Sequence, residues 1–283
     1  MTTPILDHAF ANRPFILVGA GKMGGAMLSG LLAQGLKPEQ VRVQDPAPPQ
    51  QILSQLQTHR ISPEAGPLKL ATAPAVVMLA VKPQIMEAVL PTIASIIGPD
   101  TLVISVAAGK PLSLYEKALP PQTAIVRAMP NTPAAIGQGI TGLFANASVT
   151  SAQRSVCSAI LQTLGGVVWL ENEDEMDALT AVSGSGPAYV FHMVEALAQA
   201  GINAGLAEAR ATELARQTII GAAALLDAEP ETPAGTLREN VTSPGGTTQA
   251  ALEILMHDPN GLTDLMTEAV AAAANRSREL AKD

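Results

Sequence analysis

Aromatic residues are scarce in this chain. Its 283 residues include one Trp, two Tyr and four Phe, although 47% of the chain is hydrophobic. The core must therefore be built from Ala, Val, Ile, Leu and Met. Because nucleic-acid binding depends on aromatic stacking and basic patches, and the net charge is −8, we expect no nucleic-acid partner.

Cysteine is nearly absent, since Cys157 is the only one. A single thiol excludes an internal disulfide framework and a multi-cysteine zinc site, and we expect no metal. We interpret Cys157 as a small, buried, apolar residue of a helix.

Long hydrophobic runs are also missing. No stretch approaches the ~18 consecutive apolar residues of a membrane span. Residues 1–12 lack the charged and apolar regions of a secretory signal. We therefore expect a cytoplasmic protein without a membrane partner.

The first half of the chain alternates short β-branched runs with segments of helical periodicity, which predicts an α/β Rossmann-type parallel-sheet domain. The predicted helices are 21–35, 83–97 and 151–163. The predicted strands are 15–19, 41–44, 75–80, 101–105, 123–129, 139–144 and 165–170.

The second half is alanine-rich and predicts an all-α domain, so we place the domain boundary between 1–172 and 173–283. Residues 183–186, Ser-Gly-Ser-Gly, are interpreted as a turn before a helix that carries Pro187 in its first turn. That helix is apolar almost all round and must be buried on most sides. We therefore expect a homodimer formed through the helical domain.

A glycine fingerprint closes the first strand and opens the first helix. Gly19, Gly21 and Gly24 form G-x-G-x-x-G. In this pattern the first glycine permits a tight turn, the second lets the backbone approach a pyrophosphate, and the third lets helix and strand pack closely. The sequence therefore predicts a dinucleotide site at this turn.

Asp45 ends the second predicted strand. An acid at this position accepts from a ribose 2′-OH and repels a 2′-phosphate, which favours NADH. The alternative is that Asp45 only caps a loop turn.

Two further loops follow strands and should border the same crevice. They are residues 80–83, Ala-Val-Lys-Pro, and residues 105–109, Ser-Val-Ala-Ala-Gly. Lys82 is interpreted either as a catalytic residue or as a solvated residue at the cofactor edge.

A second glycine-rich helix start lies near the end of the chain, at residues 241–249. Its backbone N–H groups at Gly245, Gly246, Thr247 and Thr248 could hold a small carboxylate. An ordinary capped helix start is the alternative.

Six segments together resemble the pyrroline-5-carboxylate reductase family. Most specific are Met-Pro-Asn-Thr-Pro at 129–133, Ser-Gly-Ser-Gly-Pro-Ala-Tyr at 183–189 and Ser-Pro-Gly-Gly-Thr-Thr at 243–248. The others are the glycine fingerprint, Ala-Val-Lys-Pro-Gln at 80–84 and Ser-Val-Ala-Ala-Gly at 105–109. The resemblance covers residues 15–280.

The resemblance implies reduction of the cyclic imine 1-pyrroline-5-carboxylate by NADPH or NADH, as the last step of proline synthesis. It also implies a homodimer through the helical domains, which can assemble into a ring such as a decamer. The implied cofactor-binding residues are Gly19, Ala20, Gly21, Lys22, Met23, Gly24, Ala80, Val81, Lys82, Pro83, Val106, Ala107, Ala108 and Asn240. The implied substrate-binding residues are Glu173, Ser243, Gly245, Gly246, Thr247 and Thr248, and Thr248 and Ser243 are the implied catalytic residues.

The chemistry needs no strong general acid, because the imine nitrogen is basic enough to arrive protonated. Three alternatives stay open: a reductase of another cyclic imine, a β-hydroxyacid dehydrogenase and a non-catalytic nucleotide sensor. The dehydrogenase family relies on a lysine in its helical half, where this chain has none before Lys282. The sensor gives no reason for the hydroxyl-rich helix start.

Overall fold

The computed structural model describes residue 10 and residues 13–281. The expectation about a secretory signal concerns residues 1–12, most of which lie outside the described residues. Lys282, the one lysine of the helical half, also lies outside them. By their internal contacts the described residues form two compact units. The sheet unit contains the residues up to Gly184 and those from Ala274 onward, and the helical unit is Ser185–Ala273.

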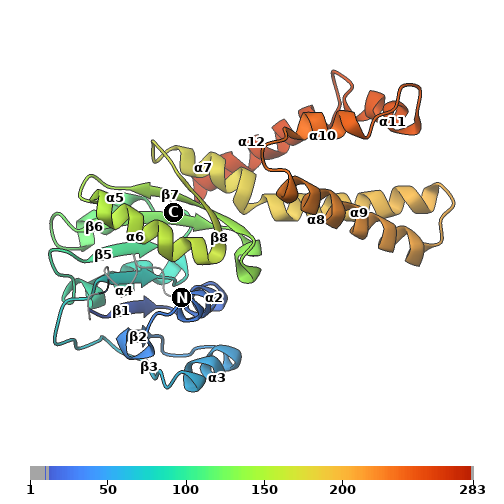
Figure 1. Cartoon of the computed structure of the whole chain (residues 1–283). Coiled ribbons are helices and arrows are strands. Elements are labelled where there is room, and N and C mark those ends of the chain that lie inside the picture. The colour runs from blue at the N-terminus through green and yellow to red at the C-terminus, as the bar shows by residue number, and fades with distance from the viewer. Residues whose placement is uncertain (1–9, 11–12, 282–283) are drawn as a thin grey trace. The chain divides into compact units, whose positions relative to one another are not determined.

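The sheet unit is built on an eight-stranded sheet with the order β3-β2-β1-β4-β5-β6-β7-β8 (Figure 1). Neighbouring strands are parallel except for β6 and β7, which are antiparallel. The strands are β1 (Phe15–Val18), β2 (Val41–Gln44), β3 (Pro63–Glu64), β4 (Val76–Leu79), β5 (Leu102–Ser105), β6 (Ala124–Pro130), β7 (Gly139–Ala145) and β8 (Gly165–Trp169).

The central strands are apolar because helices cover both of their faces. Every residue of β1, β4 and β5 is buried, as is typical of parallel strands between two helical layers. One face carries α2 (Lys22–Ala33), α3 (Gln50–Thr58) and α6 (Ser151–Leu161). The other carries α4 (Met86–Ala94) and α5 (Leu112–Ala118).

Short helical turns join several of these elements. They are η1 (Pro38–Gln40), η2 (Pro83–Ile85), η3 (Thr132–Ile136) and η4 (Gln162–Leu164). The turn η3 lies between β6 and β7, and such a short connection suits antiparallel strands.

The predicted turn at residues 183–186 is wrong. The structure has α7 (Glu175–Leu179) continuing into a π-helical turn, η5 (Thr180–Gly184), before α8 begins at Gly186. Tertiary packing outweighs the turn preference of Ser and Gly here, because Ala181 is fully buried and η5 packs against β6. Pro187 is in the first turn of α8, as predicted.

The two ends of the helical half pack on the sheet unit. Ser277 Oγ lies 2.6 Å from Asp177 Oδ1, and the Arg278 guanidinium lies 3.9 Å from the same carboxylate. These contacts tie the end of α12 to α7, and α7 packs against β7, so both segments belong to the sheet unit. The division by contacts therefore falls after Gly184, later than the predicted domain boundary at 172/173.

The helical unit contains α8 (Gly186–Asn203), α9 (Glu208–Ala228), α10 (Ala234–Asn240), α11 (Thr247–Leu255) and most of α12 (Leu262–Leu280). The helices α8 and α9 pack through small side chains, because Ala198, Ala211 and Ala215 are buried. Ala198 is the one buried residue of α8, whereas Phe191 is 64% exposed. The apolar surface predicted to be covered is therefore open within a single chain.

Cys157 is fully buried on α6, as predicted, and burial raises the pKa of its thiol. Little thiolate forms, and thiolate is the reactive species. We expect an aromatic disulfide reagent to leave the native protein unmodified at pH 8 and to modify one thiol per chain after unfolding in guanidinium. Rapid modification of the native protein would contradict the burial of this thiol.

Candidate active site

The glycine fingerprint forms a tight connection between β1 and α2. Gly19 has a φ of +90°, and a Cβ built on it would lie 2.7 Å from the carbonyl oxygen of Ala80. A Cβ on Gly24 would lie 2.2 Å from the carbonyl oxygen of Gly19. Both positions therefore require glycine, for the turn and for close packing.

Gly21 is the open member of the fingerprint. A Cβ on this residue would meet nothing within 4 Å. Gly21 is also the N-cap of α2, which no side chain caps. The helix start thus presents backbone N–H groups at an unobstructed surface, where an anion is stabilised by the helix dipole. This arrangement fits the pyrophosphate of a dinucleotide.

Asp45 stabilises the same loop by accepting hydrogen bonds from two backbone N–H groups. Its Oδ2 accepts from the backbone N–H of Ala20 at 2.6 Å, and its Oδ1 accepts from the N–H of Ala47 at 2.8 Å. The second contact is the loop cap that we considered as an alternative. Each oxygen keeps a further lone pair, so the carboxylate remains able to accept from a ribose hydroxyl.

The loop after β4 lies directly beside the fingerprint. Ala80 donates its N–H to the carbonyl oxygen of Val18 at 2.8 Å, and Val81 approaches Gly19. Lys82 is exposed and occupies the N-cap position of η2 without a side-chain capping bond. Residues 19–24 and 80–83 are therefore adjacent at the carboxyl edge of the sheet, as predicted.

The loop after β5 begins with a serine turn. Ala107 donates its N–H to Ser105 Oγ at 3.3 Å, and Val106 donates to the carbonyl oxygen of Leu79 at 3.0 Å. Ser105 Oγ also lies 2.7 Å from the hydroxyl of Tyr115 on α5. This loop thus follows β5 at the same sheet edge that the loop after β4 occupies.

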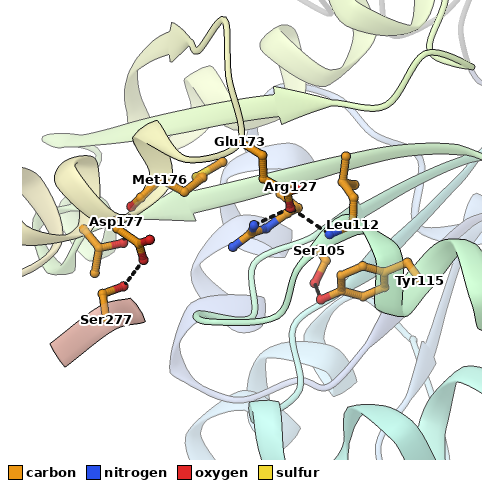
Figure 2. A network of polar contacts seen from close by, with 9 residues as sticks. Ser105, Leu112, Tyr115, Arg127, Glu173, Met176, Asp177 and Ser277 are labelled. Atoms are coloured by element: carbon orange, nitrogen blue, oxygen red, sulfur yellow. Dashed lines mark hydrogen bonds and ion pairs between the residues drawn. The ribbon is translucent and has the colours of Figure 1, made fainter. Parts of the chain in front are cut away.

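Glu173 has partners that sequence reasoning missed. Its Oε1 forms an ion pair with Arg127 of β6 and accepts from the N–H of Leu112, the first residue of α5, at 2.7 Å (Figure 2). The Arg127 side chain is 14% exposed and that of Glu173 is 32% exposed. The signal for this pair is the lone Arg127 in an apolar strand, because a buried charge requires a partner.

The second glycine-rich start lies in the helical unit, between α10 and α11. Asn240 ends α10, and Gly246 is the N-cap of α11 without a side-chain cap. The hydroxyl-bearing residues Thr247 and Thr248 open the helix. The start of α11 therefore has the features of an anion-binding helix start.

Two of the four amides predicted to hold a carboxylate already have partners. The Gly245 N–H donates to Gln249 Oε1 at 2.7 Å, and the Gly246 N–H donates to the carbonyl oxygen of Ser243 at 3.0 Å. In this structure the loop engages these two N–H groups in its own hydrogen bonds, and their contact with a carboxylate stays a prediction. Residues Ser243, Thr247 and Thr248 still surround the helix start.

Two classes of site are absent from the described part of the chain. Among residues 10 and 13–281, no group of three or more His, Cys, Asp or Glu side chains is placed to hold a metal ion. None of the helices described for this chain is long and apolar enough to cross a bilayer.

Two family models match the chain. Residues 173–280 match "Pyrroline-5-carboxylate reductase dimerisation", and residues 15–109 match "NADP oxidoreductase coenzyme F420-dependent". The first match begins at the predicted domain boundary. The first model covers the start of α11, and the second covers the glycine fingerprint and the loops after β4 and β5.

Relatives and solved structures agree with these matches. The chain is 41% identical to the pyrroline-5-carboxylate reductase of Pseudomonas aeruginosa, over 94% of this chain and 96% of the relative. It is 42% identical to that of Synechocystis, over 94% and 97%. A structure of the reductase from Coxiella burnetii has a TM-score of 0.86 at 37% identity, covering 95% of this chain and 98% of that one.

A second solved structure contains a nicotinamide cofactor. The Plasmodium falciparum pyrroline carboxylate reductase, with NADP bound, has a TM-score of 0.77 at 28% identity and covers 96% of this chain and 99% of that one. Identity above 30% over nearly the whole chain shows that this protein belongs to the pyrroline-5-carboxylate reductase family.

Proposed function

We propose that this protein reduces the C=N bond of 1-pyrroline-5-carboxylate with NADPH or NADH, giving L-proline. The observation that carries the proposal is the start of α11, which has an uncapped glycine N-cap followed by Thr247 and Thr248. A carboxylate-bearing imine needs an anion site and a small hydroxyl, and this helix start supplies both. The substrates named for the relatives support the same chemistry.

The cofactor site is proposed at the fingerprint and the loops beside it. The open helix start at Gly21 takes the pyrophosphate, and residues 80–83 and 106–108 border the dinucleotide. Asn240 is proposed to contact the cofactor from the helical unit. When bound, the nicotinamide cofactor supplies the hydride, and the protein supplies binding and orientation.

The substrate site is proposed at residues 243–248. The free N–H groups of the α11 start hold the carboxylate, and the Thr248 hydroxyl accepts from the protonated ring nitrogen. Because the nitrogen arrives with its proton, no side chain needs to act as a strong acid. Catalysis then rests mainly on orientation of the bound ring.

Glu173 has a different proposed role. Its Oε1 already accepts from Arg127 and from the first amide of α5, so we infer that it fastens residues 173–184 to the sheet. A contact of Glu173 with the substrate stays a prediction.

The assembly is proposed to be a homodimer formed through residues 173–283. The match to a dimerisation family supports it, as does the exposure of Phe191 and Leu214 in a single chain. Apolar patches of this kind mark interaction sites. A larger ring such as a decamer and a cytoplasmic location stay predictions.

We expect Thr248→Ala to lower kcat/KM for 1-pyrroline-5-carboxylate by about 10- to 100-fold, because a hydrogen bond to a charged group is lost. The measurement is the initial rate of NADH and NADPH oxidation. Thr267→Ala removes a hydroxyl from an exposed site on α12 and should leave the rate unchanged. Equal kcat/KM for Thr248→Ala and the wild type would remove Thr248 from the mechanism.

We also propose that NADH is a good cofactor, because the anionic Asp45 is held at the end of β2 by two backbone amides. Asp45→Asn should raise the ratio of kcat/KM for NADPH to that for NADH by roughly 10-fold, since a charge repelling the 2′-phosphate is removed. Asp100→Asn changes the same charge just before β5, at the amino edge of the sheet, and should leave the ratio unchanged. A wild-type enzyme with a far higher kcat/KM for NADPH would contradict this proposal.

A further inference from the structure

Two buried hydroxyl groups lie beneath the loop that follows β5. Ser105 is the last residue of β5 and is 1% exposed, and Tyr115 on α5 is fully buried. Their oxygens are 2.7 Å apart (Figure 2). Burial of two hydroxyls is unfavourable unless they pair, and most residues packed around them are apolar. A buried hydroxyl pair in place of two apolar residues therefore implies a structural or functional role.

The hydrogen bonds of Ser105 lead to the loop. A serine hydroxyl has one hydrogen and two lone pairs. Ser105 Oγ accepts from the Ala107 N–H and also forms a hydrogen bond with the Tyr115 hydroxyl, in which either oxygen can donate. Tyr115 thereby restricts the rotamer of Ser105, and Ser105 restricts the backbone of the loop.

Tyr115 keeps its hydroxyl protonated in this arrangement. Burial is the main cause that raises the pKa of its hydroxyl above the ordinary value of 10. It outweighs the hydrogen bond with Ser105 and the charge of Arg127, which lower that pKa. The hydroxyl thus keeps its proton throughout the neutral and mildly alkaline range. The contact with Ser105 does not change with pH in that range.

The hydroxyl of Thr101, at the other end of β5, serves as a comparison because it makes structural contacts only. Thr101, which directly precedes the strand, is fully buried. Its Oγ1 donates to the carbonyl oxygen of Pro74 at 2.7 Å and accepts from the Gly98 N–H at 3.0 Å. These bonds tie backbone segments at the amino edge of the sheet, away from the loops of the candidate cofactor site.

We propose that Tyr115 is a positioning residue for the dinucleotide, which acts through Ser105 to hold residues 106–108 in the conformation that contacts the cofactor. This rests on the proposed function, in which those residues border the cofactor. A loop held in its binding conformation loses less entropy on binding. Loss of the tyrosine hydroxyl therefore weakens cofactor binding without changing the substrate site.

The test compares Tyr115→Phe, Ser105→Ala, the double variant and Thr101→Val in the full-length enzyme. The readouts are the Kd of NADH and of NADPH by calorimetry, KM and kcat for the preferred cofactor, and Tm. We expect Tyr115→Phe to raise Kd and KM for the cofactor by about 3- to 10-fold, the worth of one neutral hydrogen bond. The values of kcat and of KM for 1-pyrroline-5-carboxylate should change by less than about twofold on the same scale.

The remaining variants separate positioning from stability. The double variant should bind the cofactor no more weakly than Ser105→Ala alone, because Tyr115 acts through Ser105. Thr101→Val should lower Tm and leave the Kd of the cofactor unchanged. If Tyr115→Phe does not fold, Ser105→Ala must by itself show the rise in Kd.

Three results would overturn the inference. One is a cofactor Kd equal to that of the wild type for Tyr115→Phe, or for Ser105→Ala if the tyrosine variant does not fold. Another is a double variant whose loss of cofactor affinity equals the sum of the losses in the two single variants. The third is an equal rise in Kd for Thr101→Val, which would show a general effect of stability. A wild-type enzyme that does not oxidise either cofactor with 1-pyrroline-5-carboxylate would instead refute the proposed function, so the two failures are distinguishable.

Discussion

A Cβ on Gly24 would lie 2.2 Å from the carbonyl oxygen of Gly19, and this close backbone approach is the constraint on which the sheet unit's site depends. It places the start of α2 directly against the turn after β1. The uncapped amides of that helix then face the carboxyl edge of the sheet, beside the loop after β4. Asp45 reinforces the arrangement, because its carboxylate binds the amide of Ala20 within the same loop. An anion site thus arises mainly from backbone geometry.

Reliance on backbone groups also explains why the chain has few conventional catalytic side chains. Four histidines, one cysteine and seven aromatic residues leave little for acid–base or nucleophilic catalysis. The proposed substrate brings a proton on its nitrogen and a negative charge on its carboxylate. In the proposed mechanism, glycine-rich helix starts and one hydroxyl, that of Thr248, then suffice for binding and orientation. Apolar alanine-rich helices supply the surface through which a second copy is proposed to bind.

Local sequence patterns predicted most of the fold. The apolar strands and the glycine fingerprint were predicted within a residue or two, because a buried parallel strand and a tight turn each have strong local signatures. The turn at residues 183–186 was wrong because packing of Ala181 decided the local conformation. The short helices α3 and α5 were not predicted.

Contacts between distant residues were the least predictable part of the site. The pairing of Arg127 with Glu173 and of Ser105 with Tyr115 depends on the folded arrangement of β5, β6 and α5. The lone Arg127 in an apolar strand is a signal that a partner exists, but it does not specify which one. In the loop before α11, the engaged amides of Gly245 and Gly246 depend on a turn whose hydrogen bonds no spacing rule specifies.

The central claim is that backbone amides at the start of α11 hold the substrate carboxylate and so orient the imine. The direct measurement is kcat/KM for 1-pyrroline-5-carboxylate against that for 1-pyrroline, the same ring without the carboxylate. We expect the carboxylate to raise kcat/KM by about 100-fold or more, the worth of two or more hydrogen bonds to a charged group. Equal values for the two rings would contradict the account.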